Sequence, residues 1–296
     1  MSTRRPALVV AVAVVLLAAC RPTTAGDTAS DSSATTETRE TRETVETIAY
    51  GPGPDQVLDL HLPDGDDVVP VVVLLHGGFW RDIYVRDLTD PLARALAERG
   101  YAAVNLEYGR VGGTGGWPRT FEDVAAGIDH LGELDHPRLD LARVAVIGHS
   151  AGGLLATWTA VRAGLPDDAP GADPAVVPVA VVSLAGVNEL TRAAEEGLGA
   201  GAPQDLLGGR PAEVPDRYRV ADPAQRLPLD VPWLGVHAET DDSVPLDMTI
   251  GFAARLEAAG GDATVEIVAG DHMSVIEPGA GSFAVVLDWL SARLDP

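Results

Sequence analysis

The sequence contains no lysine, and all 21 of its basic residues are arginine. Without lysine the chain cannot form a Schiff-base lysine, a pyridoxal phosphate anchor or a Walker-type phosphate loop. The single cysteine, Cys20, excludes an internal disulfide and a Cys-rich zinc or iron–sulfur site. Acidic residues outnumber basic ones by 44 to 21, a net charge of -23. This balance argues against nucleic acid as a partner, because binding it requires a basic surface.

The first 19 residues have the pattern of an export signal. Two arginines precede an apolar run over Ala7–Ala19, which is shorter than the ~20 residues that a membrane-spanning helix needs. Leu17-Ala18-Ala19-Cys20 resembles the lipobox of bacterial lipoproteins, which implies cleavage before Cys20 and diacylation of its thiol. We therefore expect a signal peptide over 1–19 and a lipid anchor at Cys20 on the outer face of the bacterial cell membrane. The alternative is an ordinary signal peptide that is cleaved nearby.

A tether is expected between this signal and the folded part. Residues 20–44 are rich in Thr, Ser, Ala, Glu, Asp and Arg and contain no aromatic side chain. Such a segment buries too little apolar surface to offset the entropy lost on ordering, so we expect disorder. Residues 45–296 are then expected to form one domain, which is an ordinary length for an α/β fold.

Strands and helices alternate along this domain. Val68–Leu75 and Tyr101–Leu106 are nearly continuous apolar runs, which is typical of strands covered on both faces. Thr120–Leu131 carries apolar residues at helical spacing. The pattern predicts an α/β fold with a mostly parallel sheet and helices on both faces. Residues 186–229 interrupt the alternation with Gly, Pro, Ala and Glu, and we expect them to form a small lid over the carboxyl edge of the sheet.

The segment Gly148-His149-Ser150-Ala151-Gly152 follows a predicted strand and opens a predicted helix. A serine at such a sharp turn needs small residues two positions before and after it, because the backbone is crowded there. Its hydroxyl then projects over the sheet edge, next to a helix N-terminus that favours developing negative charge. This context predicts that Ser150 is a nucleophile; the alternative is a plain glycine-rich strand-to-helix turn.

A serine nucleophile needs a base that accepts its proton. In hydrolases with this kind of turn the acid and the histidine follow the serine along the chain. His272, in Gly270-Asp271-His272-Met273, stands just after the last predicted strand, where the fold delivers a base to the sheet edge. His149 lies within the turn itself, and His237 lies in a strand, where a histidine is more often structural. We therefore predict that His272 is the base.

The acid that orients this base is expected on the loop after the strand that ends near His237. Glu239, Asp241 and Asp242 are the candidates. Asp241-Asp242-Ser243-Val244-Pro245 resembles the Asp-x-x-Val-Pro loop of many α/β-hydrolases, in which the first aspartate is the triad acid. This resemblance favours Asp241. Asp242 remains the alternative, as a solvated neighbour or helix cap.

Acyl transfer also needs two N–H donors aimed at the developing oxyanion. His76-Gly77-Gly78-Phe79-Trp80 follows a buried strand, and its glycines allow the backbone to approach a substrate. The placement fits an HGGG-type oxyanion loop, although Phe79 stands in place of the third glycine. We expect donors from Gly78 or Phe79 and from Ala151.

Together these motifs make residues 50–294 resemble the α/β-hydrolase superfamily, in its esterase and lipase branch. The resemblance is narrower to kynurenine formamidase-like and feruloyl-esterase-like (BD-FAE-like) members, which carry HGG followed by an aromatic residue and Trp. Those members usually have Ser where this chain has Asp222. The segments that carry the narrower resemblance are Tyr50-Gly51-Pro52, Leu58-Asp59-Leu60, His76 to Arg81, Asn105-Leu106-Glu107-Tyr108, Leu207-Gly208-Gly209 to Tyr218, and Ala221-Asp222-Pro223.

The sequence thus predicts a cofactor-free serine hydrolase that cleaves carboxylic esters through an acyl-enzyme on Ser150. An arylformamidase-like amidase would use the same residues on a different substrate. A surface lipoprotein that uses the fold only as a binding module is the non-enzymatic alternative. No metal is expected, because the histidines are scattered and no two stand four residues apart.

Overall fold

The computed structural model describes residues 44–295. The predicted signal peptide over 1–19, Cys20 and the tether up to residue 43 lie outside the described residues. No helix within the described part combines the length and the apolar character needed to cross a membrane.

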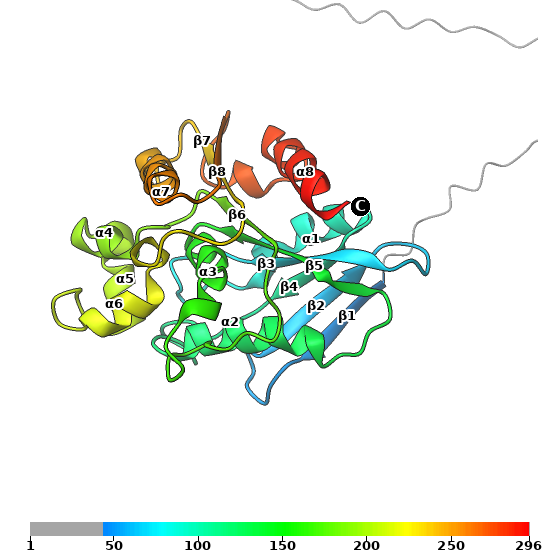
Figure 1. Ribbon diagram of the computed structural model, residues 1–296, viewed down its shortest axis with the longest axis horizontal. Coiled ribbons are helices and arrows are strands. Elements are labelled where there is room, and N and C mark those ends of the chain that lie inside the picture. The colour runs from blue at the N-terminus through cyan, green and yellow to red at the C-terminus, as the bar shows by residue number, and fades with distance from the viewer. Residues whose placement is uncertain (1–43, 296) are drawn as a thin grey trace, which may run out of the picture. The chain divides into compact units, whose positions relative to one another are not determined.

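One sheet of eight strands, in the order β1-β2-β4-β3-β5-β6-β7-β8, runs through the described chain (Figure 1). β2 is antiparallel to both of its neighbours, β1 and β4, and every other neighbouring pair is parallel. The strands are β1 (Thr44–Ala49), β2 (Val57–Leu62), β3 (Val69–Leu75), β4 (Ala102–Leu106), β5 (Leu139–His149), β6 (Ala180–Leu184), β7 (Trp233–Ala238) and β8 (Ala263–Val268).

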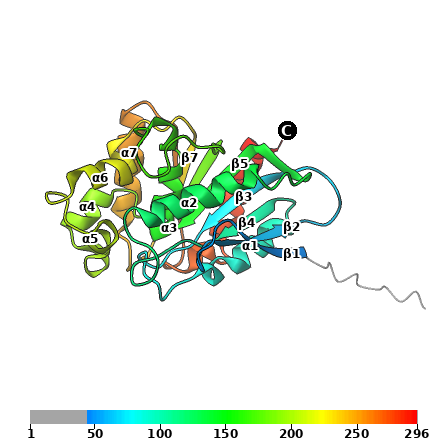
Figure 2. The same ribbon diagram turned by 90° about the horizontal axis from the view of Figure 1, so that it is seen from below.

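Helices cover both faces of this sheet, as Figures 1 and 2 show. In β3, Val71, Val73 and Leu75 pack in the apolar core with α2, α3 and α7. The alternate residues Val72 and Leu74 pack in the core with α1 and α8 on the other face. The predicted α/β class, with a mostly parallel sheet between helices, is confirmed. These helices are α1 (Asp90–Ala97), α2 (Arg119–Asp129), α3 (Ala151–Thr159), α7 (Leu246–Ala258) and α8 (Gly281–Leu294).

The segment between β6 and β7, expected to be a lid, folds into three short helices that lie together at one end of the molecule (Figures 1 and 2). We call this segment, residues 186–229, the insertion. Apolar side chains of its helices join the core cluster of α2, α3 and α7. The insertion therefore packs on the domain. Its helices are α4 (Leu190–Glu195), α5 (Ala202–Leu207) and α6 (Pro215–Ala221).

Asp222 ties two parts of the insertion together. One carboxylate oxygen accepts hydrogen bonds from the backbone N–H of Leu190 and of Ala224, both at 3.2 Å. The other accepts from the backbone N–H of Thr191 at 3.0 Å and from its hydroxyl at 2.6 Å. A carboxylate has two oxygens for these donors, whereas the serine usual in the resembling proteins has one. Asp222 thus joins the start of α4 to the turn that follows α6.

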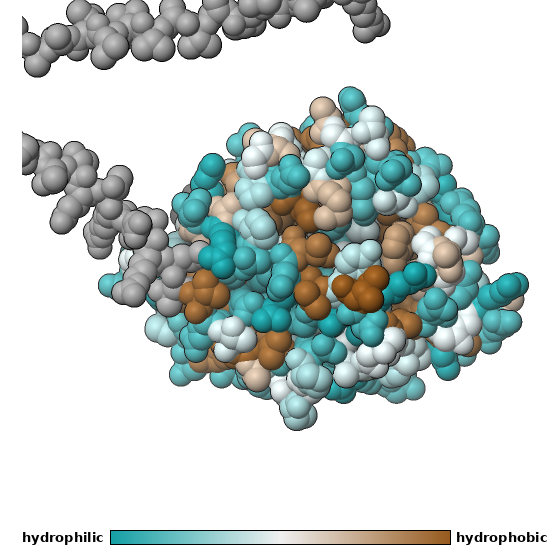
Figure 3. All heavy atoms as spheres, turned by 180° about the vertical axis from the view of Figure 1, so that it is seen from behind, coloured by the Kyte–Doolittle hydropathy of each residue, from teal (hydrophilic) through white to brown (hydrophobic). Residues whose placement is uncertain are grey.

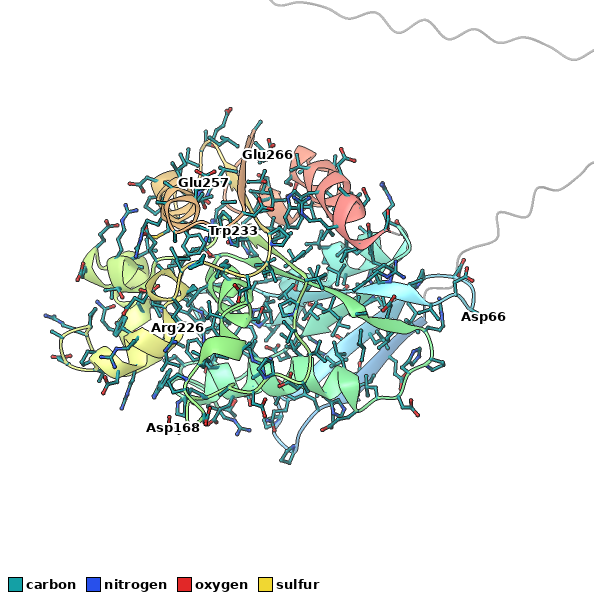
Figure 4. The ribbon with its side chains drawn as sticks, in the orientation of Figure 1. Asp66, Asp168, Arg226, Trp233, Glu257 and Glu266 are labelled. Carbon is teal, nitrogen blue, oxygen red and sulfur yellow. The ribbon has the colours of Figure 1, made fainter. Side chains whose placement is uncertain are left out.

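The interior is mainly apolar, and the exterior is charged. Trp233 lies inside the fold in Figure 4, and its indole N–H donates to the Thr157 hydroxyl at 3.1 Å. Asp66, Asp168, Glu257 and Glu266 lie at the periphery in the same view. The face shown in Figure 3 is largely hydrophilic, with apolar side chains exposed singly or in small groups.

Candidate active site

Ser150 sits at the sharp turn between β5 and α3, with φ 55° and ψ -118°. A left-handed φ is unusual for a residue with a side chain and marks backbone strain, which proteins keep mainly at functional sites. The small residues of the motif make the turn possible. A Cβ atom on Gly148 would lie 2.0 Å from the carbonyl oxygen of Gly152. The expected crowding is therefore present, and it holds Ser150, which is 2% exposed, at the end of β5.

The loop after β3 packs directly against this turn. A Cβ on Gly152 would lie 2.1 Å from the carbonyl oxygen of Leu75, at the end of β3. A Cβ on Gly77 would lie 2.8 Å from His149 Nδ1 and 3.0 Å from the Cβ of Ser150. The fully buried Trp80 donates its indole N–H to the carbonyl oxygen of Ala151 at 3.1 Å. The structure thus brings the predicted oxyanion loop and the predicted nucleophile together.

Three consecutive residues of this loop have left-handed φ: Gly78 at 111°, Phe79 at 51° and Trp80 at 56°. Gly78 must be glycine, because a Cβ there would also lie 2.4 Å from the side chain of Tyr84. Within residues 44–295, the backbone N–H groups of Gly78, Phe79 and Ala151 donate no hydrogen bond to another protein group. All three predicted donors are thus available to a ligand.

His272 and Asp241 meet at the same edge of the sheet. His272 Nδ1 lies 2.7 Å from Asp241 Oδ2, and the Asp241 side chain is fully buried. The other oxygen of Asp241 accepts the backbone N–H groups of Ser243 and Val244, both at 2.9 Å. The alternative Asp242 is exposed, and its carboxylate accepts a hydrogen bond from the neighbouring Ser243 hydroxyl. Asp241, and not Asp242, is therefore the acid that contacts the predicted base.

A second histidine contacts the same carboxylate. His237, on β7, is completely buried, and its Nε2 lies 3.3 Å from Asp241 Oδ2. Burial raises the pKa of Asp241, but hydrogen bonds from His237, His272 and the Val244 and Ser243 N–H groups outweigh it. The net effect holds the pKa of Asp241 far below its ordinary value. Asp241 is therefore ionised throughout the range in which a histidine base works.

His149, next to Ser150, contacts the backbone of the predicted base. Its Nε2 lies 2.9 Å from the carbonyl oxygen of His272 and therefore carries the proton and donates it. The ring centroids of the two histidines lie 4.7 Å apart. Burial and the nearby His272 lower the pKa of His149 to about 3, so it is neutral near pH 7. His149 thus joins the strand-to-helix turn to the loop that carries His272.

The described contacts do not include a hydrogen bond between the Ser150 hydroxyl and the ring of His272. Catalytic hydrogen bonds are often long or poorly aligned in ligand-free enzymes and shorten in the substrate complex. The structure therefore joins His272 to Asp241 directly, and to Ser150 through His149, its neighbour in the chain.

A buried ionic cluster lies behind the oxyanion loop. His76 Nε2 lies 2.9 Å from the Glu107 carboxylate, which also pairs with Arg110 and accepts the backbone N–H of Arg86 at 3.0 Å. Burial raises the pKa of Glu107, but its contacts with His76, Arg86 and Arg110 lower it by more. The pKa of Glu107 is therefore below its ordinary value. The Tyr108 hydroxyl donates to the His76 carbonyl oxygen at 2.7 Å. This cluster fixes the start of the loop that carries Gly78 and Phe79.

The insertion contacts the oxyanion loop. Arg81 donates to the carbonyl oxygen of Gly199 at 2.8 Å, and a Cβ on Gly199 would lie 2.5 Å from the Phe79 ring. Trp117 donates its backbone N–H to the Leu206 carbonyl in α5 at 2.7 Å. The insertion thus borders the site. Over residues 44–295, no group of three or more His, Cys, Asp or Glu side chains is placed to hold a metal ion.

Sequence reasoning gave no role to His237, His149 or Glu107 in this site. A strand position alone predicts a structural role for His237, and Glu107 stands out only as part of a motif of the resembling family. A charged residue directly after a buried strand is a signal that could have identified Glu107. The histidine contacts join segments far apart in the chain, and residue spacing does not show them.

Relatives of this chain are described as esterases. Esterase LipQ of Mycobacterium tuberculosis is 29% identical over 229 residues, which are 72% of this chain and 52% of LipQ. The probable carboxylic ester hydrolase LipM of the same organism is 30% identical over 224 residues, 71% of this chain and 51% of LipM. The chain therefore spans about half the length of these curated relatives.

Solved structures share the fold. A truncated carbohydrate esterase from gut microbiota superposes with a TM-score of 0.74 at 20% identity, over 87% of this chain and 99% of that one. The family model BD-FAE matches residues 58–256, a span that contains the Ser150 turn and Asp241. The chain therefore belongs to the BD-FAE family and has the α/β-hydrolase fold.

Proposed function

We propose that this protein hydrolyses carboxylic esters, with Ser150 as nucleophile, His272 as general base and acid, and Asp241 as the orienting carboxylate. The observation that carries the proposal is the 2.7 Å contact between His272 Nδ1 and a buried Asp241, at the sheet edge where Ser150 occupies a strained turn. The esterase names of LipQ and LipM support the same reaction class.

In the proposed reaction, Ser150 Oγ attacks the carbonyl carbon of the ester while His272 Nε2 accepts the hydroxyl proton. His272 then gives this proton to the leaving alcohol oxygen as the C–O bond breaks. A water molecule, deprotonated by His272, then attacks the acyl carbon. The bond to Ser150 Oγ breaks, Oγ takes the proton back from His272, and the carboxylic acid leaves. Asp241 remains ionised throughout and stabilises the imidazolium that forms in each step.

The negative charge that develops on the carbonyl oxygen needs donors placed before the reaction. The free N–H groups of Gly78, Phe79 and Ala151 lie on segments that are packed together by Gly77 and by the Trp80–Ala151 hydrogen bond. The N–H of Ala151 is also at the N-terminus of α3, where the helix dipole favours an anion. We assign the oxyanion site to Ala151 together with Gly78 or Phe79.

We further propose, from the sequence motif at Cys20, that the protein is exported and held at the outer face of the membrane by a lipid. Diacylation would provide the two chains that stable anchoring requires. The Cys20→Ser variant is expected to leave the membrane fraction, whereas the unchanged chain stays in it. Recovery of both forms in the membrane fraction would contradict the lipid anchor.

The proposed reaction can be tested with 4-nitrophenyl acetate and butyrate. Ser150→Ala removes the nucleophile, so kcat is expected to fall by about 10⁴-fold or more. Ser291→Ala removes a hydroxyl that donates to the Asp288 carbonyl within α8, and this variant should retain full activity. Turnover by Ser150→Ala at the rate of the unchanged enzyme would contradict the proposal. An N-formyl aromatic amide in the same assay distinguishes an ester hydrolase from an arylformamidase-like amidase.

The neutral state of His149 predicts how stability depends on pH. Its folded pKa of about 3 lies below the ordinary value of about 6.5, so between these values only the unfolded chain binds the proton. The free energy of unfolding should therefore decrease as the pH falls from 6.5 to 4.5, by up to about 1.4 kcal/mol per unit from this group.

Urea unfolding at several pH values measures this slope. His149→Gln keeps an N–H donor for the His272 carbonyl but cannot titrate, so its stability should fall less steeply over the same range. His136→Gln, at a partly exposed histidine, serves as the matched control and should keep the original slope. Equal slopes in all three proteins would show that His149 is not the group responsible.

A further inference from the structure

His237 is the one buried histidine of the described chain that contacts the carboxylate of the predicted acid. It lies on β7, two strands away from Ser150 in the sheet, and none of its surface is exposed. Its Nε2 is 3.3 Å from Asp241 Oδ2 and 3.0 Å from the carbonyl oxygen of Val244. Its Nδ1 is 2.8 Å from the Thr249 hydroxyl on α7. Each ring nitrogen of His237 thus has a defined partner.

These partners determine where the proton of His237 lies. The Val244 carbonyl can only accept a hydrogen bond, so Nε2 must carry hydrogen. That hydrogen is donated to the carbonyl, and the Asp241 carboxylate lies 3.3 Å from the same nitrogen. Nδ1 can then accept from the Thr249 hydroxyl, which is able to donate. The arrangement fits a neutral ring that donates through Nε2.

Asp241 Oδ2 is therefore shared between two imidazoles, His272 at 2.7 Å and His237 at 3.3 Å. The opposite oxygen is already fixed by the two backbone N–H groups of the following loop. Without His237, the base itself would be the only side chain in residues 44–295 that holds Oδ2 in place. A donor on the far side also draws negative charge away from His272, which affects how strongly the carboxylate stabilises the imidazolium.

We propose that His237 is a positioning residue that acts through Asp241: it fixes the carboxylate toward His272 and limits the basicity of that histidine. The proposal rests on the proposed function, because it assigns His272 as the base. Titratable groups next to His272 and Asp241 include His149, whose ring packs on that of His272, and their chain neighbours Asp271 and Asp242.

Two substitutions distinguish the effect of the hydrogen-bond donor of His237 from the effect of its side-chain volume. His237→Gln retains an Nε2–H donor at the same number of bonds from the backbone, whereas His237→Leu fills the space without a donor. Loss of a hydrogen bond to a charged group is expected to lower kcat by about tenfold in His237→Leu, with KM changed less than twofold. His237→Gln should restore most of the lost activity. Equal losses in both variants would contradict the proposal, because only bulk would then matter.

A titration of His272 provides a readout that does not depend on turnover. NMR of the full chain follows the His272 ring signals against pH, with assignment by a His272→Gln variant. In His237→Leu the His272 titration should move to higher pH by roughly half a unit, since the carboxylate then presents more of its charge to the imidazolium. An unchanged titration, with only a lower melting temperature, would show that His237 is merely part of the core.

A double-mutant cycle tests whether His237 affects the reaction through Asp241. In the Asp241→Asn background the carboxylate is absent, so adding His237→Leu should change kcat/KM by less than twofold. A further tenfold loss there would mean that His237 acts independently of Asp241 and would overturn the proposal. If the unchanged protein hydrolyses no ester at all, the proposed function fails, and the NMR titration still decides whether His237 acts on His272 through Asp241.

Discussion

The backbone segments at the ends of β3 and β5 pack so closely that no Cβ atom fits at Gly148 or Gly152. Gly152 lies against the carbonyl oxygen of Leu75, and Gly148 lies against the carbonyl oxygen of Gly152. This close approach forces Ser150 into its left-handed conformation and places the loop after β3 beside it. The proposed nucleophile and the proposed oxyanion donors therefore depend on one steric constraint, and a methyl group at either glycine would separate them.

Neutral histidines support the contact between Asp241 and His272. Asp241 is buried and ionised because four donors outweigh the cost of its burial. His149 stays neutral because it is buried beside His272, and it holds the backbone of the base. A second positive charge next to His272 would disfavour the imidazolium that the proposed reaction requires. Burial thus keeps the supporting histidine uncharged where a charge would interfere with the base.

Local sequence patterns predicted much of this arrangement. Apolar runs such as Val68–Leu75 marked the central strands because a parallel sheet is covered on both faces. The spacing of glycines around Ser150 identified the turn, since the crowding there depends on a few adjacent residues. Asp241 and His272 were identified from chain order and a loop motif, and they lie in contact.

The remaining features depend on contacts between distant segments, which composition and spacing do not encode. A histidine in a strand predicts a structural role, and only the fold brings Nε2 of His237 near Asp241. The helices of the insertion were not predicted individually, because α4 and α5 are short and gain stability from packing rather than from propensity. The Glu107–His76 pair likewise needs β3 and β4 to lie side by side.

The most direct test of the account is covalent labelling of the 45–296 chain with a fluorophosphonate, followed by mass spectrometry of its peptides. A reactive serine beside a base forms a stable phosphonyl adduct, whereas ordinary hydroxyls do not. The account expects one adduct per chain, located on Ser150 and lost in Ser150→Ala. No adduct, or an adduct on another residue, would contradict the assignment of Ser150 as the nucleophile and would favour a binding role for the fold.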